Sequence, residues 1–199
     1  EGERLVEALA AVSAPRADCG AGAPKIGICF QNRYNRGSQE LHRLLASGDL
    51  GAVRGAYASV VWSRTAEYYA AKPWRGRWDM DGGAFMNQAS HYVDMVDWLV
   101  GPVDNVHAYT ATQGRDIEAE DSGVMSLRLR AGGLASINVT MLTYPKNLEG
   151  SITVLGERGT VRIGGVAVND IQHWEFDAPR PEDEQIKAAS YATTSVYGF

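Results

Sequence analysis

The feature of this sequence that most constrains its fold is a series of short segments in which apolar and polar residues alternate. Alternation with a period of two places successive side chains on opposite faces of a strand, so each segment predicts a strand with one buried face. Two pairs of segments are joined by short glycine-containing turns, as in antiparallel hairpins. The pairs are residues 123–130 with 134–142, around Ala131-Gly132-Gly133, and 151–155 with 160–163, around Gly156-Glu157-Arg158-Gly159. Successive hairpins predict a mainly antiparallel sheet.

Other segments add three strands and a helix to this sheet. The three further strands are expected at residues 53–62, 103–111 and 166–176. Residues 85–100 predict a helix that follows Gly82-Gly83 and ends at Gly101-Pro102. We therefore expect the α+β class: an open, mainly antiparallel β-sheet covered on one face by helices.

The beginning of the chain differs from the sheet-forming part. Residues 1–12 carry apolar residues at helical spacing, and residues 13–24 are rich in Ala, Gly and Pro, which predicts a loop. Residues 25–30 form the continuous apolar run of a strand buried on both faces, and a helix is expected at 38–47. Strand, loop and helix make one α/β unit, so this part is interpreted as the end of a larger α/β domain. The expected divisions are 1–52, a sheet domain at 53–176 and an irregular tail at 177–199.

The acidic composition argues against several classes of partner. The 199 residues include 24 acidic and 19 basic side chains, a net charge of -5. Nucleic acids and anionic membranes favour dense Lys and Arg, so neither is an expected partner. No apolar run approaches the roughly 20 residues of a membrane helix, and no signal peptide is visible, so a cytoplasmic protein is expected. Cys19 and Cys29 match no zinc pattern and are interpreted as reduced thiols.

The helix expected at 85–100 has two faces that differ in chemistry. One stripe is apolar and is expected to pack on the sheet: Met86, Ala89, Val93, Val96 and Val100. The other carries Asn87, His91, Asp94 and Trp98. Asp94 lies three residues beyond His91, so it is expected to favour the protonated imidazole. Such a histidine can transfer a proton near neutral pH, although a surface His beside an Asp is also common without catalysis.

Two loops are candidates for ligand binding. The first, residues 68–78, combines aromatic and basic side chains that suit a sugar ring, phosphate or carboxylate: Tyr68, Lys72, Trp74 and Arg75 among them. The same aromatic residues could instead plug the edge of the sheet. The second, residues 143–150, offers Tyr144, Lys146 and Asn147, although a loop of this size is more often a connector.

Together these segments resemble the glucose–fructose oxidoreductase / inositol dehydrogenase family. Gly82, Gly83, Asn87, His91 and Asp94 fit that family's pattern of a glycine pair, an acid or amide, a histidine and an aspartate. The match is nearer to a branch of bacterial dehydrogenases that act on UDP-N-acetylglucosaminuronic acid. It is carried by the strings QNRYN (31–35), KPWRGRWDMDGG (72–83), NQASHYVD (87–94), MLTYPKNLEGSITVLGERGTV (141–161) and VNDIQHWEF (168–176).

The resemblance implies a C-terminal sheet domain preceded by the last strand and helix of a truncated Rossmann domain. It implies NAD as cofactor, a UDP-sugar as substrate and a homo-oligomer formed through the open sheet face, where Val124, Ser126, Ile137 and Val139 are expected. The implied site residues are His91, Asn87 and Asp94 for catalysis, Arg33, Tyr68, Lys72, Trp74, Arg75, Asn87, Gln88, Tyr144, Lys146 and Asn147 for substrate, and Gln31 and Arg33 for cofactor.

Two departures from the family pattern bear on function. The chain contains no G-x-G-x-x-G, and Lys72-Pro73 is not the family's Glu-Lys-Pro motif because it follows the first strand of the sheet. We therefore expect this chain alone to bind no NAD. Two hypotheses remain open: the substrate-side domain of an NAD-dependent sugar-nucleotide oxidoreductase, or a module that assembles or binds a sugar nucleotide without turnover.

Overall fold

The structure is a computed structural model that describes residues 27–165 and 168–190, together with Arg4 and Glu7. The chain divides into two units, residues 1–30 and 31–199. In the first unit Arg4 and Glu7 are helical, and the rest of the helix expected at 1–12 lies outside the described residues. Residues 27–30 form no strand, so the strand expected at 25–30 is wrong over its described part.

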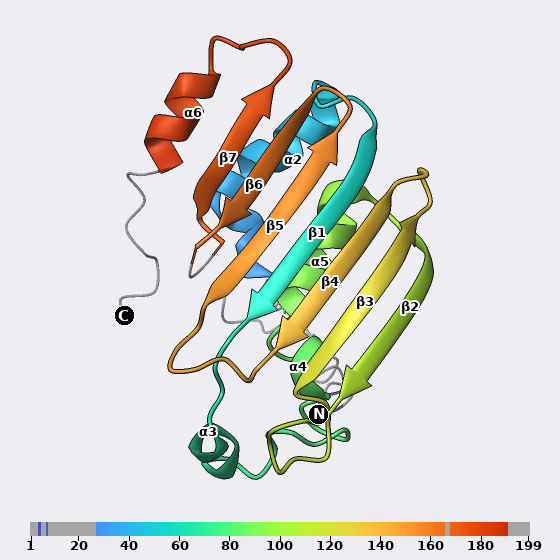
Figure 1. Cartoon of the computed structure of the whole chain (residues 1–199), viewed down its shortest axis with the longest axis vertical. Helices are drawn as coiled ribbons and strands as arrows, with labels where there is room; N and C mark the ends of the chain where they lie inside the picture. Colours follow the sequence, from blue (N-terminus) through green and yellow to red (C-terminus); the bar gives the residue numbers. More distant parts are fainter. Residues whose placement is uncertain (1–3, 5–6, 8–26, 166–167, 191–199) are drawn as a thin grey trace, which may run out of the picture. The chain divides into compact units, whose positions relative to one another are not determined.

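The second unit contains a sheet of seven strands, mainly antiparallel as predicted (Figure 1). The strands are β1 (Val53–Val61), β2 (Val103–Ala111), β3 (Ser122–Leu129), β4 (Leu134–Thr140), β5 (Glu149–Gly156), β6 (Gly159–Gly164) and β7 (Asp170–Phe176). Their order across the sheet is β2-β3-β4-β1-β5-β6-β7. The pairing of β1 with β4 is parallel, and the other neighbouring strands are antiparallel. Each hairpin expected from the sequence is present, which confirms the open α+β sheet.

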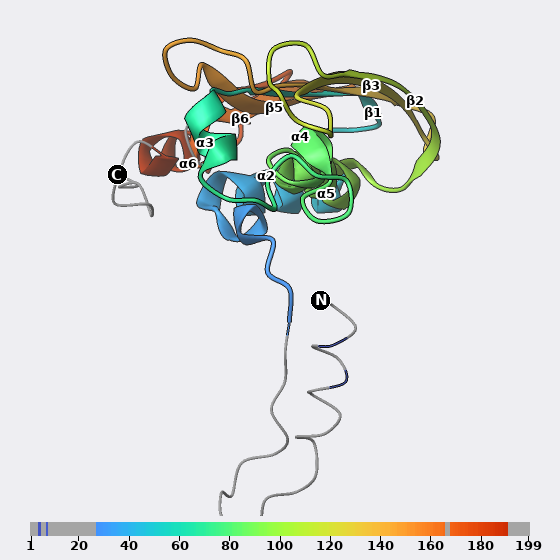
Figure 2. The same cartoon turned by 90° about the horizontal axis from the view of Figure 1, so that it is seen from below.

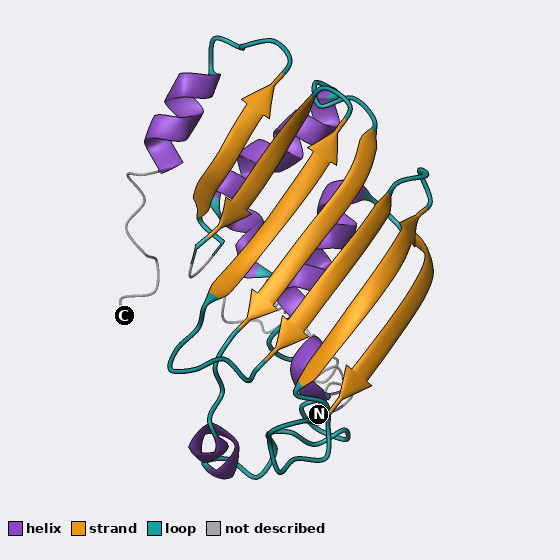
Figure 3. Cartoon of the chain, in the orientation of Figure 1, coloured by secondary structure: helices purple, strands orange, loops and turns teal. Residues whose placement is uncertain are grey.

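Helices cover one face of this sheet, as Figures 2 and 3 show. The helical elements are η1 (Gln31–Tyr34), α2 (Arg36–Ser47), α3 (Ala66–Ala70), α4 (Gly83–Met86), α5 (Ser90–Val100) and α6 (Asp183–Ser190). Helix α2 packs against α5 within the second unit. The division into compact units thus falls before η1, within the segment 1–52 that the sequence set apart from the sheet domain. None of these helices is long and apolar enough to cross a membrane.

The core lies between the sheet and α5. The central strand β1 contributes the buried side chains of Ala56, Ala58 and Val60, and these small residues let the helix approach closely. From α5 the buried apolar side chains are Tyr92, Met95, Val96, Leu99 and Val100. The apolar stripe expected from the sequence is therefore only partly right. Met86 is 71% exposed and Val93 38% exposed, because the helix is interrupted and rotated relative to a continuous one.

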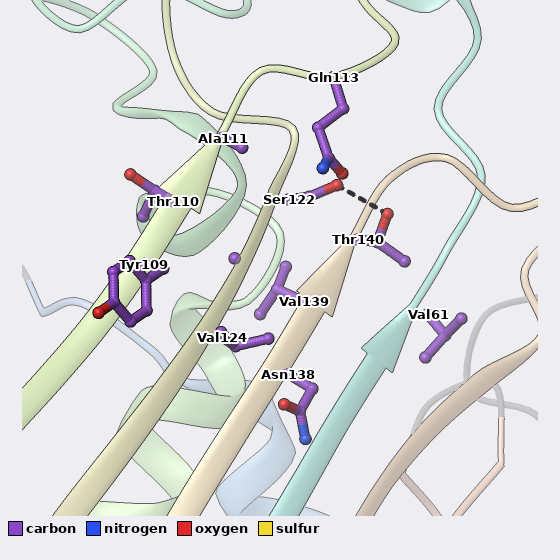
Figure 4. A pocket seen from close by; sticks show the side chains of 11 residues that line it. Val61, Tyr109, Thr110, Ala111, Gln113, Ser122, Val124, Asn138, Val139 and Thr140 are labelled. Carbon is purple, nitrogen blue, oxygen red and sulfur yellow. Dashed lines mark hydrogen bonds between the residues drawn. The ribbon is translucent and has the colours of Figure 1, made fainter.

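The second face of the sheet lies open. Tyr109 pairs with Val124, and Val124 with Asn138, so these three side chains share one face (Figure 4). They line a shallow pocket of about 380 Å³ with Thr140 and Ser122, whose hydroxyls lie 2.9 Å apart. Ile137 and Val139 were expected on this face, which is wrong. Ile137 and Val139 flank Asn138 along β4, so their side chains point to the opposite face of the sheet, where they are buried under the helices.

The segment after β7 contains a helix where an irregular tail was expected. Helix α6 is held through Asp183, whose carboxylate accepts hydrogen bonds from Trp174 Nε1 at 2.8 Å and Arg180 Nη2 at 2.6 Å. Ile186 on this helix is buried. The helix is attached through only one apolar residue and one carboxylate, so the polar composition of the segment gave no sign of it. Residues 191–199 of the expected tail lie outside the described residues.

Ile137 tests the packing of the helix layer. It is fully buried in β4, so Ile137→Ala should lower the free energy of unfolding by about 2–5 kcal/mol through lost burial and a cavity. Ser126→Ala, at an exposed position of β3, should change it by less than about 0.5 kcal/mol. Urea denaturation followed by circular dichroism measures both. Equal effects of the two substitutions would contradict this assignment of the two faces.

Candidate functional site

A pocket of about 270 Å³ lies at the start of α5 and collects residues from distant parts of the chain. Its lining consists of Gln31, Asn32, Trp62, Arg64, Tyr68, Asn87, Gln88, His91, Tyr92 and Val168. The sheet positions this pocket because Trp62 and Arg64, which line it, follow directly after the end of β1 at Val61. We call it the histidine pocket.

A break in the helix places two amides beside the histidine. The sequence predicted one helix over 85–100, but the structure has α4, a turn at residues 87–89, and then α5. Glu120 explains the separate start of α4, because its backbone oxygen accepts from Ala84 N–H and its Oε1 from Phe85 N–H, both at 3.0 Å. At Asn87 the backbone departs from helical geometry, with φ -99° and ψ -84°. Asn87 and Gln88 thereby line the pocket with His91.

Steric restriction explains a glycine in the pair before α4. Gly83 has φ +83°, and a Cβ built on it would lie 2.2 Å from Glu120 Oε2. A larger residue would displace the carboxylate that starts α4. The space next to Gly83 is therefore occupied by Glu120.

His91 lies beside an ion pair that fixes its acidic neighbour. Asp94 binds Arg33 through two hydrogen bonds, Nε to Oδ2 at 2.8 Å and Nη2 to Oδ1 at 2.5 Å. Burial lowers the pKa of His91, and the nearby charge of Asp94 opposes this only partly. Asp94 favours the protonated ring, as expected from the sequence, but burial outweighs its attraction. A neutral imidazole at neutral pH can accept a proton.

The two amides are held by other side chains. Asn87 Nδ2 donates to Asp81 Oδ1, and Gln88 Nε2 donates to the hydroxyl of Tyr68 at 3.2 Å. Asn87 thus lines the pocket while its amide nitrogen is held by Asp81. Tyr92 is buried beneath, and this burial raises the pKa of its hydroxyl, which stays protonated.

The structure brings together only part of the site expected from the sequence. Gln31, Tyr68, Asn87, Gln88 and His91 line the histidine pocket. Arg33 is not among the lining residues, because its guanidinium is engaged by Asp94. Lys72 and Arg75 line a neighbouring pocket, described below, and Trp74 contacts Arg75, with the guanidinium 5.2 Å from its ring centroid.

The loop after β4 was expected to contribute to the site, but its predicted residues do not line the histidine pocket. Tyr144 is 94% exposed and Lys146 is exposed, and neither lines the histidine pocket. Asn147 uses its side-chain oxygen to accept from Ser63 N–H at 2.9 Å, so it ties the loop to the end of β1. It lines a different pocket, of about 450 Å³.

Trp62 and Arg64 were missed by sequence reasoning. The one feature of the sequence that could have identified them is their position immediately after an apolar strand, where loop residues often carry function. Arg64 lies over both neighbouring aromatic rings, 5.2 Å from the Trp62 centroid and 5.3 Å from that of Tyr68. No group of three or more His, Cys, Asp or Glu residues in the described part of the chain is arranged to hold a metal ion.

Fold and site place the chain among the C-terminal α+β domains of oxidoreductases. Levoglucosan dehydrogenase shares the fold, with a TM-score of 0.68 at 18% identity, over 77% of this chain and 45% of that one. The chain belongs to the GFO/IDH/MocA C-terminal domain family, whose model matches residues 38–162. An uncharacterized oxidoreductase of Synechocystis sp. is 24% identical over 72% of this chain and 42% of its own length.

Two solved relatives are much more similar in sequence. The WlbA dehydrogenase of Bordetella pertussis, in complex with NADH and UDP-GlcNAcA, is 59% identical with a TM-score of 0.77, over 79% of this chain and 47% of that one. WlbA of Chromobacterium violaceum, with the same two ligands, is 60% identical with a TM-score of 0.78, over 82% of this chain and 47% of that one. The chain thus spans about half the length of these relatives.

The balance of burial and charge at His91 can be measured by NMR titration of its ring protons. The pKa of His91 should lie below the unperturbed value of about 6.5. Asp94→Asn should lower it further, because the substitution removes the negative charge that favours the protonated ring. Asp97→Asn, a change on the exposed side of the same helix, serves as the control and should shift it less. An increase in pKa on Asp94→Asn would contradict the assignment.

Proposed function

We propose that this domain is the substrate side of an NAD-dependent dehydrogenase that oxidises a hydroxyl of a sugar nucleotide, at C3 of a UDP-N-acetyl-hexuronic acid. The observation that carries the proposal is the pocket in which His91, with a lowered pKa, lies beside Asn87 and Gln88. The identity of 59% to a WlbA dehydrogenase solved with NADH and UDP-GlcNAcA supports the choice of substrate.

The chemistry that the domain's own residues perform is proton transfer. As hydride leaves the sugar carbon, the hydroxyl proton must also leave, and neutral His91 accepts it. The resulting imidazolium is stabilised by the nearby carboxylate of Asp94, which its two hydrogen bonds with Arg33 hold in place. Asn87 cannot take a proton, so its role is to bind the substrate through its carbonyl oxygen, together with Gln88.

NAD, when bound, supplies the hydride acceptor of such a reaction. The described residues do not fit its pyrophosphate, since none forms the glycine-rich turn before a helix that holds this group in Rossmann domains. Of the two residues expected at the cofactor, Gln31 lines the histidine pocket and Arg33 is bound to Asp94. We therefore propose that the 199-residue chain alone does not bind NADH.

The role of His91 is tested in a fusion of this chain with the nucleotide-binding domain of the Bordetella pertussis relative. His91→Ala should lower kcat by about a hundredfold to ten-thousandfold, the usual effect of removing a general base, and leave NADH affinity unchanged. His173→Ala, exposed on β7, is the matched control. NADH formation from UDP-N-acetylglucosaminuronic acid is followed by absorbance, and calorimetry of the unfused chain should give no saturable heat with NADH.

Two outcomes would count against this function. If His91→Ala keeps more than about a tenth of the rate, the histidine is structural. If the fusion binds the sugar nucleotide but forms no NADH, the alternative of a binding or assembly module without turnover is favoured.

We also propose that a second copy of the chain covers the open sheet face. Tyr57, Tyr109, Val124 and Leu134 are 46–70% exposed, and their strand registers place them on this one face. Such a concentration of apolar surface is typical of an interface.

Val124→Arg should convert the oligomer to a monomer, since it places a charge in the middle of that face. Val106→Arg is the matched control, because Val106 is equally exposed at 55% but shares the opposite face with Leu127. Multi-angle light scattering measures the mass of each. A monomeric wild-type chain at high concentration would overturn this proposal.

A further inference from the structure

Two arginines lie over the ring of Tyr68, which lines the histidine pocket, and a third arginine is hydrogen-bonded to one of them. The guanidinium of Arg75 lies 3.9 Å from the centroid of the Tyr68 ring, and that of Arg64 lies 5.3 Å from it. Arg115, from the loop between β2 and β3, donates from Nε to the backbone oxygen of Arg64 at 2.6 Å. We call Arg64, Arg75 and Arg115 the arginine cluster.

In the described part of the chain this cluster lacks ion-pair partners, although the Glu67 carboxylate lies near enough to Arg115 to interact with its charge. Six other arginines form ion pairs with carboxylates: Arg33, Arg43, Arg54, Arg77, Arg162 and Arg180. The cluster arginines are half-buried, yet across the described ranges no carboxylate oxygen lies within 4.0 Å of their nitrogens. Their hydrogen bonds go to neutral oxygens, those of Ser63, Tyr68, Gly114 and Asn147 besides that of Arg64.

Some donors of the cluster remain free for a ligand. The Nε atom of Arg75 is buried and has no hydrogen-bond partner among the described residues. The side-chain bonds of Arg115 use Nε and Nη1, and its Nη2 donates to no atom in the described ranges. Partly buried guanidinium groups without an ion-pair partner are costly unless an anion binds, and their planar donors fit phosphate oxygens.

The cluster joins two pockets. Arg64 lines the histidine pocket, whereas Arg75 and Arg115 line a second pocket of about 500 Å³ with Lys72. Asp116 and Glu118 also line this second pocket, but neither pairs with the cluster. The histidine pocket, at about 270 Å³, falls just below the roughly 300–1,000 Å³ of typical ligand sites, so a sugar ring suits it better than a whole nucleotide sugar.

Asp121 holds this arrangement rigid. It is fully buried, and its carboxylate accepts from the backbone N–H groups of Gln113, Gly114 and Arg115 at 2.9–3.1 Å. The loop that carries Arg115 is therefore fixed before any ligand arrives, which reduces the entropic cost of binding.

From these observations we propose that the arginine cluster binds the diphosphate of a nucleoside diphosphate sugar, with the sugar ring in the histidine pocket and the nucleoside toward the second pocket. The proposal rests on the proposed function and adds the residues that recognise the diphosphate. Two of them, Arg64 and Arg115, were not expected from the sequence. A diphosphate diester carries two negative charges at neutral pH, and it matches a cluster of cations that lack carboxylate partners.

The experiment is calorimetric titration of the 199-residue chain with three probes: UDP, uridine and glucuronate. UDP should bind, and uridine, which lacks phosphate, should bind at least tenfold more weakly. Arg115→Gln should weaken UDP binding by about tenfold to a hundredfold, the range for a lost charged hydrogen bond. Arg128→Gln, which removes the same charge from the exposed open face of β3, should leave UDP binding unchanged.

Thermal unfolding of each variant shows whether it folds. If Arg115→Gln is unfolded, Lys72→Gln replaces it, since Lys72 is exposed and its side chain makes no hydrogen bond or ion pair in the part of the chain that is described. Lys72→Gln should weaken UDP binding by at least threefold, because it removes one of the cationic groups of the second pocket.

Several results would overturn the proposal. They are no UDP binding at millimolar concentration, equal affinity for uridine and UDP, or equal UDP affinity of Arg115→Gln and Arg128→Gln. Glucuronate binding that depends on Arg115 while UDP binding does not would assign the cluster to a sugar carboxylate and also refute the diphosphate site. UDP lacks the hexuronic acid whose hydroxyl would be oxidised, so a fusion without dehydrogenase activity would refute the proposed function and leave this test unaffected.

Discussion

Two adjacent buried carboxylates, Glu120 and Asp121, are the constraint on which the site depends. They precede β3 directly, and each satisfies backbone N–H groups of a different segment. Glu120 binds the first turn of α4, which separates this helix from α5 and turns Asn87 and Gln88 toward His91. Asp121 binds the loop that presents Arg115. The two carboxylates at the start of β3 thus orient both the histidine pocket and the arginine cluster.

The cost of burying these carboxylates explains the residues around them. An ionised group away from water is tolerated only when hydrogen bonds replace its hydration. Asp121 accepts three such backbone bonds, and Glu120 accepts from Phe85 N–H while its Oε2 lies without a partner in the described structure. The space around Oε2 accommodates no side chain at position 83, which accounts for Gly83.

Most of the fold could be predicted from the sequence because it depends on local patterns. Period-two alternation and glycine turns locate β3 to β6, and helical spacing locates α2. The errors arise where distant contacts decide. The break at Asn87 depends on Glu120, more than thirty residues away, and α6 depends on Asp183 meeting Trp174. The candidate site divides in the same way. His91 and Asn87 stand in one sequence motif, whereas Arg64 and Arg115 come together only in the folded chain.

The parallel pairing of β1 with β4 has a consequence for how the domain folds. Strand β1 ends at Val61, yet its two neighbours in the sheet begin at Leu134 and Glu149. The centre of the sheet therefore closes only after a loop of more than seventy residues has been brought together, and the hairpins β3-β4 and β5-β6 can form earlier as local units. Domains dominated by such distant pairings fold slowly. During synthesis on the ribosome, β1 must remain unpaired until β4, which begins at Leu134, has emerged.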